Sequence, residues 1–276
     1  MRSLFKKGLN RLGFSRRNEV HIVSFPKSGR TWLSIMVGEY FKRKHQLDVV
    51  DVLETHLYTN KIPNIPTVHF SHGEDRTLWK TPAELETDKS KFKGTKVLLL
   101  VRDPRDIIVS AYFQKTKRHQ LVSKERQEKL NKPVFEGSLQ SFVYDEHGGI
   151  DTLIAYYNHW INSRKVPDTF EMLKYETLRK DTFQSFEKVL NLIGIESPDK
   201  TLMREIIEFT DFENLKKLEK QNHYSTFKLA PVDHTDAESY KVRKGKVGGY
   251  LDYLDKKEID YLNQKIKNDL SPLIGY

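Results

Sequence analysis

The sequence predicts an α/β protein in which helices flank a central parallel sheet on both faces, as a three-layer sandwich. Short apolar runs of strand length alternate along the chain with segments whose apolar residues recur at helical spacing. The run KVLLLV at 96–101 is typical of a strand that is covered on both faces of a parallel sheet. No repeat or linker interrupts the pattern, so we expect one domain over residues 19–276 after a basic segment at 1–18.

Each element follows from a local pattern. Apolar runs bounded by polar or turn residues predict four strands, at 20–25, 67–70, 96–101 and 169–175. Apolar residues three or four positions apart predict helices at 33–43, 106–114, 151–161, 183–193 and 259–270. Gly194 is the expected C-terminal cap of the fourth helix, and Ser197 the expected N-cap of a further one that has Pro198 in its first turn. We expect the charged stretch 115–132 on the surface, as an excursion or as a helix over the sheet.

Composition excludes several classes of protein. The 276 residues include no cysteine, which rules out disulfides, thiolate metal sites and a cysteine nucleophile. The apolar runs are far shorter than the roughly 20 residues that span a bilayer, and no secretory signal is visible, so we expect a cytoplasmic protein. The net charge of +9 predicts an anionic partner: nucleic acid, anionic lipid or a polyanionic small molecule. The charge is spread along the chain, which disfavours a dedicated nucleic-acid arm.

The loop SFPKSGRTW at 24–32 joins the first strand to the first helix and suits an anion. Ligands of parallel sheets bind at the carboxyl ends of the strands. The loop offers backbone N–H groups around Gly29, the positive end of a helix, and the cations Lys27 and Arg30. A simple capped helix start would show similar residues. The loop is not a Walker A sequence, since Lys27 precedes the glycine, and this weakens an ATP or GTP interpretation.

Two further segments suit anions. Arg102 leaves the strand 96–101 at the same edge of the sheet, and Ser110 follows in the next helix, so the two side chains are expected to hold a phosphate. Structural ion pairs, Arg102–Asp106 or Asp103–Arg105, are the alternative. The segment YKVRKGKVGGYLDYL at 240–254 groups cations around a glycine, although a charge run is also typical of a solvated surface.

The three segments and their order along the chain resemble three motifs of the PAPS-dependent sulfotransferase family, and the resemblance covers roughly residues 20–254. SFPKSGRTW is similar to the family's 5′-phosphosulfate loop, LLLVRDPRDIIVSAYF to its 3′-phosphate segment, and VRKGKVGGYLDYL to its RKG motif. The resemblance implies a P-loop nucleotide-hydrolase-like fold. It also implies transfer of a sulfuryl group from 3′-phosphoadenosine 5′-phosphosulfate (PAPS) to a hydroxyl or amine, without a metal.

The resemblance also implies roles for the matched residues. Lys27 would contact the bridging oxygen and stabilise charge on the leaving phosphate. The remaining matches would bind PAPS: Ser28, Gly29, Arg30 and Thr31 around the 5′-phosphate, Trp32 against adenine, Arg102, Ser110, Arg243, Lys244 and Gly245 at the 3′-phosphate, Tyr175 near adenine, and Thr210 and Phe212 over the nucleotide.

The sequence departs from the family pattern at three places. Arg30 stands where Thr is usual, Asp211 where Ser is common, and Gly249-Tyr250 where Asp-Trp is frequent. The short C-terminal dimerisation motif of the family has no match, which leaves the oligomeric state open.

A base must take the proton of the acceptor, and histidine suits neutral pH. We favour His72, because it follows the second strand as the base of the family does. His56 in ETHLY is the second candidate, and His69, inside the strand, is expected to be a packed residue. Glu54 and Glu74 remain alternatives, since some sulfotransferases that act on sugars use a carboxylate.

Other functions stay open at this point. A P-loop kinase would have a related fold, and a basic nucleic-acid-binding protein would explain the charge, although we expect no nucleic acid as partner. Apolar residues among the cations of 1–18 suit a short amphipathic membrane anchor, although a frayed terminus or a helix packed on the domain is the favoured interpretation. The acceptor is expected to be a small molecule or glycan, and the polar segments 115–149 and 221–240 favour a carbohydrate or other polar alcohol.

Overall fold

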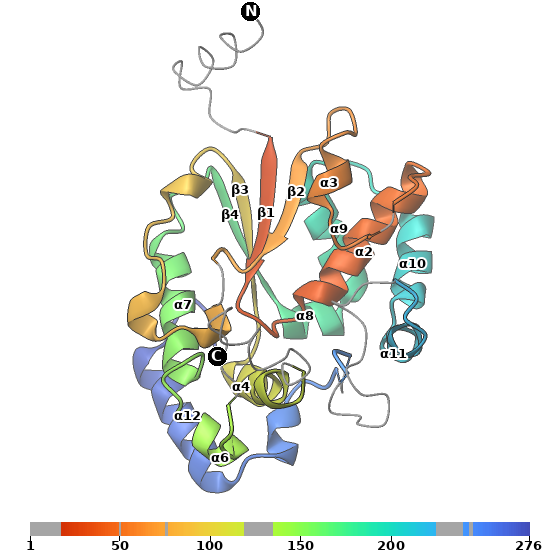
Figure 1. Ribbon diagram of the computed structural model, residues 1–276. Helices are drawn as coiled ribbons and strands as arrows, with labels where there is room; N and C mark the ends of the chain where they lie inside the picture. The colour runs from red at the N-terminus through yellow and green to blue at the C-terminus, as the bar shows by residue number, and fades with distance from the viewer. Residues whose placement is uncertain (1–17, 50, 75–76, 119–134, 225–239, 243–244) are drawn as a thin grey trace, which may run out of the picture.

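Four parallel strands form the centre of the computed structural model (Figure 1). The structure describes residues 18–49, 51–74, 77–118, 135–224, 240–242 and 245–276. The strands lie in the order β2-β1-β3-β4, where β1 is Glu19–Ser24, β2 Thr67–Ser71, β3 Lys96–Val101 and β4 Thr169–Lys174. Because all neighbouring strands are parallel, their carboxyl ends meet at one edge of the sheet.

Helices cover both faces of the sheet and make three layers (Figure 1). One face packs against α2 (Arg30–Lys44), α9 (Thr182–Ile193) and α10 (Lys200–Phe209). The other packs against α4 (Pro104–Phe113), α7 (Ile150–Asn162) and α12 (Lys256–Asp269). Successive strand residues alternate between the two cores, with Leu98 in the first and Leu99 in the second. Because both faces are covered, the central strand β3 is apolar and buried from Val97 to Val101, whereas the edge strand β4 leaves Glu171 and Met172 exposed.

Shorter elements complete the described chain. They are α3 (His56–Thr59), α6 (Leu139–Phe142), α8 (Tyr175–Lys180), α11 (Phe212–Lys220), the 3₁₀ turns η1 (Thr77–Trp79), η2 (Pro82–Glu84), η3 (Ser90–Phe92) and η6 (Gly249–Asp252), and the π-helical turn η4 (Gln114–Arg118). Within the described ranges, no helix is both long enough and apolar enough to span a membrane.

The α/β class, the parallel sheet and the predicted strands and helices are confirmed, with small shifts of their ends. Gly194 ends α9 in the left-handed conformation, at φ 107°. The predicted cap at Ser197 is wrong: α10 begins at Lys200, and the Asp199 carboxylate accepts the N-capping hydrogen bond from the Leu202 N–H. Of the charged stretch 115–132, residues 115–118 lie in η4 and the rest lies outside the described residues, as do residues 1–17.

The strand order determines where a ligand site can form. From β1 the chain moves to β2 on one side, then crosses to β3 on the other side of β1. The loops that follow β1 and β3 therefore lie next to each other at the carboxyl edge of the sheet. Such a reversal of strand order opens a crevice in α/β proteins, and ligands bind there.

Candidate active site

A cavity of about 850 Å³ lies at this carboxyl edge. Its walls come from the loops after β1, β2 and β3, and from α8, α11 and the segment around residue 245. Twelve of the predicted site residues line it: Lys27, Gly29, Arg30, Thr31, Trp32, His72, Arg102, Ser110, Tyr175, Thr210, Phe212 and Gly245. Arg243 and Lys244 lie outside the described residues. The structure therefore brings together segments that are far apart in the sequence.

The first loop has an unusual backbone. Lys27 has φ 75°, a left-handed conformation that costs a non-glycine residue free energy and that is common at functional sites. Gly29 has φ 91°, and a Cβ atom there would lie only 2.4 Å from the ring of Tyr175. Glycine is thus required both by the backbone angle and by the close approach of the ring. The turn directs the start of α2, with its unpaired N–H groups, towards the cavity.

The hydroxyl of Ser28 faces away from the cavity. It donates to the Phe25 carbonyl over 2.9 Å and lies 3.5 Å from the Tyr157 hydroxyl, and Ser28 is fully buried. The Ser28 hydroxyl is therefore committed to the loop itself. Any contact from Ser28 to a ligand would come from its backbone N–H.

Arg102 connects three parts of the cavity. Its guanidinium donates to the Lys27 carbonyl and to the Lys246 carbonyl, each over 3.2 Å, and stacks 4.5 Å from the ring centre of Tyr175. The structural ion pairs also form, since Arg102 lies 3.4 Å from Asp106. The Arg102 Nε atom is buried and has no hydrogen-bond partner among the described residues. A buried donor without an acceptor is costly, so the structural contacts of Arg102 leave one donor of its guanidinium unsatisfied within the described residues.

Asp106 fixes the glycine-rich C-terminal segment, a role that the sequence reasoning missed. Its carboxylate accepts hydrogen bonds from the Gly248 and Tyr250 N–H groups, each over 3.0 Å. Gly245 has φ 58°, and a Cβ atom there would lie 2.5 Å from the Phe212 ring. Residues 245–250 are therefore held against α4 on one side and α11 on the other.

Aromatic residues form the wall next to the loop. The Trp32 indole N–H donates to the Thr210 carbonyl over 2.9 Å, and its ring meets Tyr175 edge to face at 6.2 Å. The guanidinium of Arg179 lies 5.3 Å from the Trp32 ring. The hydroxyl of Thr210 is turned inward to the Ile206 carbonyl. This wall offers a flat aromatic surface beside a cation.

The side chain of Lys27 is held by Gln114, the second contact that the sequence reasoning missed. The Lys27 ammonium donates to the Gln114 side-chain oxygen over 2.9 Å. Gln114 begins the π-helical turn η4, directly after α4. Such turns are often found at functional sites. The only signal in the sequence was the position of Gln114 at the end of the helix that carries Ser110.

His72 is neutral and has one nitrogen directed towards Arg30. The His72 Nδ1–H donates a hydrogen bond to the Ser24 carbonyl over 2.8 Å, so Nε2 carries the lone pair. Arg30 Nη2 lies 3.0 Å from Nε2 and donates to it. Burial of the ring, followed by the positive charge of Arg30, holds the pKa of His72 well below its usual range, and Lys241 and Lys27 add to this effect.

The other candidate bases differ in their position. His56 lies on α3, 3.5 Å from Glu54, and neither residue lines the cavity. Glu74 does line it, but its carboxylate is already engaged. It accepts from the Lys80 ammonium and from the Glu86 N–H, and Lys89 lies 3.9 Å away. Among these groups, His72 has the geometry of a base that faces the cavity.

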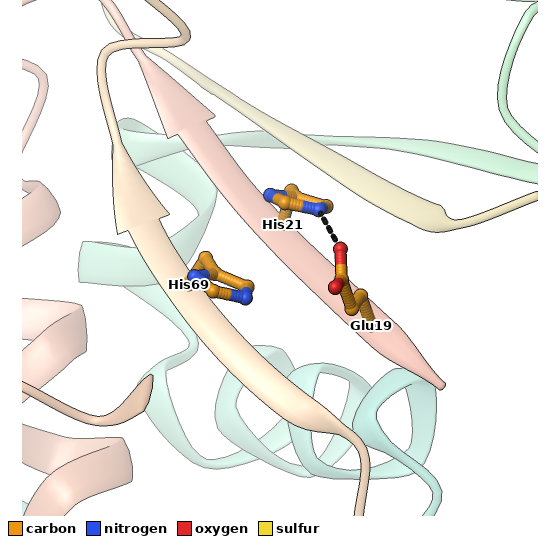
Figure 2. Close-up of side chains that lie close together, drawn as sticks. All are labelled: Glu19, His21 and His69. Carbon is orange, nitrogen blue, oxygen red and sulfur yellow. Dashed lines mark hydrogen bonds and ion pairs between the residues drawn. The ribbon is translucent and has the colours of Figure 1, made fainter. Parts of the chain in front are cut away.

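One group of described side chains could offer metal ligands, and it lies apart from the cavity. Figure 2 shows Glu19 and His21 on β1 beside His69 on β2, with ligand atoms within 4.8 Å of one another. The two imidazoles are stacked at 4.8 Å and nearly parallel, at 11°. Because an imidazole lone pair lies in the plane of its ring, one ion cannot meet both lone pairs in this arrangement. The group therefore forms a stacked pair, in which His21 lies 3.2 Å from the Glu19 carboxylate.

The fold is that of an α/β protein with its cavity at the switch point of the sheet, and comparison with known proteins gives the family. The sulfotransferase domain model matches residues 17–273. The chain thus belongs to the sulfotransferase family, and the predicted enzyme class is confirmed.

Individual relatives agree with this assignment. Cytosolic sulfotransferase 17 of Arabidopsis thaliana is 27% identical over 257 residues, which cover 87% of this chain and 70% of the relative. Flavonol 3-sulfotransferase of Flaveria bidentis is 26% identical over 268 residues, which cover 92% of this chain and 82% of the relative. The crystal structure of mouse sulfotransferase SULT7A1 complexed with PAP has a TM-score of 0.59 at 18% identity, over 92% of this chain and 85% of that one. The likeness to the mouse protein shows a shared fold.

Proposed function

We propose that the protein transfers a sulfuryl group from PAPS to a hydroxyl or amine of a small-molecule acceptor. The observation that carries the proposal is the meeting of two cationic loops, around Lys27 and Arg102, with His72 in one cavity. Sulfuryl transfer needs the reactants held in line, positive charge at the leaving phosphate and a base for the acceptor proton. Family membership supports the reaction, and the PAP with which the mouse sulfotransferase is complexed supports the donor.

The residues present fit such a donor. The start of α2 offers N–H groups and a positive dipole to the 5′-phosphate, with the Thr31 hydroxyl on the cavity wall. The Nε of Arg102, which has no partner within the described ranges, suits the 3′-phosphate, with Ser110 nearby on the same wall. Trp32 and Tyr175 supply an aromatic wall for adenine. Arg243 and Lys244 belong to the proposed 3′-phosphate site, although they lie outside the described residues.

The transfer step is proposed to run without a metal. The acceptor oxygen attacks the sulfur while the bond from sulfur to the bridging phosphate oxygen breaks. The acceptor proton passes to Nε2 of His72, the nitrogen that carries the lone pair. Lys27, whose ammonium is held by Gln114, stabilises the negative charge that the phosphate gains.

The acceptor side of the cavity is mixed in character. Leu78 and Trp79 give apolar surface, while Glu74, Glu86 and Lys91 give charge. The polar groups favour a carbohydrate or other polar alcohol, whereas the Flaveria relative, a flavonol sulfotransferase, favours a phenol. A cytoplasmic location and a single domain over 19–276 are part of the proposal, and the Arabidopsis relative, a cytosolic sulfotransferase, supports the first.

Calorimetric titration with 3′-phosphoadenosine 5′-phosphate (PAP), beside ATP with magnesium and beside a DNA duplex, tests the donor site. We expect selective binding of PAP, and a loss of affinity of about tenfold or more in Arg102→Ala, because hydrogen bonds to charged groups contribute about 1.5–3 kcal/mol. Lys27→Ala should reduce turnover more than it reduces PAP affinity. Selective binding of ATP would favour a kinase, and binding of DNA alone would favour a nucleic-acid-binding protein; either result would contradict the proposal.

His72 is then tested by turnover. PAPS is supplied with a panel of phenols, steroids and sugars, and an acceptor found in this way is repeated with His72→Gln. We expect turnover to fall by a factor of about 100 or more, as is typical when a general base is removed, while PAP affinity is retained. Equal turnover in His72→Gln would refute its role as base and direct attention to Glu74.

A further inference from the structure

Within the described ranges, Arg30 is a cation of the cavity without a counter-charge. It begins α2 and lines the cavity, and its guanidinium contacts the imidazole of His72 at 3.0 Å. Among the described residues, no carboxylate lies within ion-pair distance of Arg30, in contrast to Arg102 and Arg105, which pair with Asp106 and Asp103. Arg30 therefore differs from Arg102 and Arg105, and its closest polar contact is the imidazole of the proposed base.

The position is costly for a cation. Arg30 is half-buried, and burial lowers the pKa of its guanidinium to about 10. A desolvated charge is stabilised mainly by a partner of opposite sign, and an imidazole lone pair is a weak substitute for one. An oxyanion that reaches the cavity would be a much better partner, since guanidinium binds carboxylate, phosphate and sulfate oxygens with two parallel hydrogen bonds.

The same contact occupies the base. The Nδ1 proton of His72 is donated to the Ser24 carbonyl, and the Nε2 lone pair accepts from Arg30. Neutral imidazole has one donor and one acceptor nitrogen, so both are in use. His72 can take a proton from an acceptor only after Arg30 has moved away from Nε2. The charges of Arg30, Lys241 and Lys27 also weaken it as a base, and a nearby anion would reverse that effect.

We propose that Arg30 is the binding position for an oxyanion beside the base, and that the arrival of this oxyanion draws Arg30 from His72 and frees Nε2. The inference rests on the proposed sulfotransferase reaction and adds a requirement for negative charge at this point. Three sources of such an oxyanion exist: the 5′-phosphate of the donor, the sulfuryl group of the donor, or a carboxylate, sulfate or phosphate carried by the acceptor. In the third case the natural acceptor is an anionic alcohol or phenol.

Nitrogen NMR of histidine-labelled full-length protein tests the inference, with His72→Gln used to assign the His72 signals. The ligands are PAP, which lacks the sulfuryl group, then PAPS, then PAPS with benzoate or with its neutral analogue benzamide. Neither benzoate nor benzamide offers a hydroxyl, so both serve as unreactive probes of the acceptor side. The readout is the shift of Nε2, which reports loss of the hydrogen bond from Arg30.

Each source gives its own result. A shift already with PAP identifies the 5′-phosphate as the oxyanion. A shift with PAPS but not with PAP identifies the donor sulfuryl group, and Arg30→Thr should then reduce the preference for PAPS over PAP by about tenfold or more. A further shift with benzoate but not with benzamide identifies an anionic acceptor. If PAP binds and Nε2 responds to none of these ligands, the inference is overturned, while the proposed function survives. If PAP itself does not bind, the proposed function fails first.

Variants separate the role of Arg30 from folding and from general charge. Arg30→Thr should raise the pKa of His72 and remove the response of Nε2 to the oxyanion. Arg30→Lys keeps the charge and should keep part of that response. Lys256→Thr removes a cation from the surface, where Lys256 pairs with Asp260 outside the cavity, and should leave the response unchanged. A response that persists in a folded Arg30→Thr protein would contradict the inference.

Discussion

Asp106 offers a sharp test of how the site is held together. Its side chain is 2% exposed, and its carboxylate accepts from the Gly248 and Tyr250 N–H groups over 3.0 Å and pairs with Arg102 at 3.4 Å. Asp106→Asn keeps the size of the side chain but replaces one acceptor oxygen with an N–H₂ donor, which would face these donors. Removing one partner of a buried charged network costs about 3–5 kcal/mol.

We therefore expect Asp106→Asn to lower the free energy of unfolding by at least about 3 kcal/mol, which for a chain of this size lowers the melting temperature by about 6 °C or more. PAP affinity should fall as well, because residues 248–250 and Arg102 lose their common anchor. Urea unfolding and PAP calorimetry measure the two effects. Asp260→Asn is the matched control, since Asp260 pairs with Lys256 on the surface, where such pairs contribute about 0–1 kcal/mol. A melting temperature and PAP affinity equal to those of the wild type would refute the reasoning.

Three other substitutions test further parts of the site. Gly29→Ala should lose about 1–3 kcal/mol of stability and most PAP affinity, in unfolding and calorimetry, because φ is 91° and the new Cβ atom would meet the Tyr175 ring. Tyr157→Phe should cost about 1–3 kcal/mol, measured by urea unfolding, because its hydroxyl is the acceptor for the Arg102 N–H at 3.0 Å. His72 stays neutral in the folded protein and is protonated in the unfolded chain at acid pH, so stability falls as pH decreases below the unfolded-state pKa, by up to about 1.4 kcal/mol per pH unit. His72→Gln should lose stability less steeply between pH 7 and pH 5, and an unchanged slope in urea unfolding would contradict this.

The sheet could be predicted from the sequence because its central strands are buried on both faces. A run such as 97–101 has few alternatives, since a strand is apolar at every position only where both of its faces are covered. Helix ends were less predictable. Ser197 and Asp199 are both good N-cap residues. The structure uses Asp199, whose backbone N–H also donates to the Tyr40 hydroxyl on α2 over 3.0 Å, a tertiary contact that no local pattern records.

Some features of the candidate site could be predicted from the sequence and others could not. The loops that line the cavity could be located in advance, because parallel strands bring their carboxyl ends to one edge. Contacts between individual side chains could not. The hydrogen bond from Lys27 to Gln114 joins residues 87 positions apart, and that from Arg30 to His72 joins residues 42 apart. The Ser28 hydroxyl likewise lies 3.5 Å from the hydroxyl of Tyr157, which the sequence places on a distant helix.

These contacts make the cavity and the fold interdependent. Arg102 donates to carbonyls of the first loop and of the C-terminal segment, so the same guanidinium that would hold a phosphate also fixes two loops that no strand connects. Tyr157, from α7, holds the Arg102 backbone on the other side. The cations of the site are thus kept close together by neutral acceptors and by Asp106, before any ligand arrives. An anionic ligand relieves the repulsion that remains among them, and its binding therefore stabilises the folded state through the groups that recognise it.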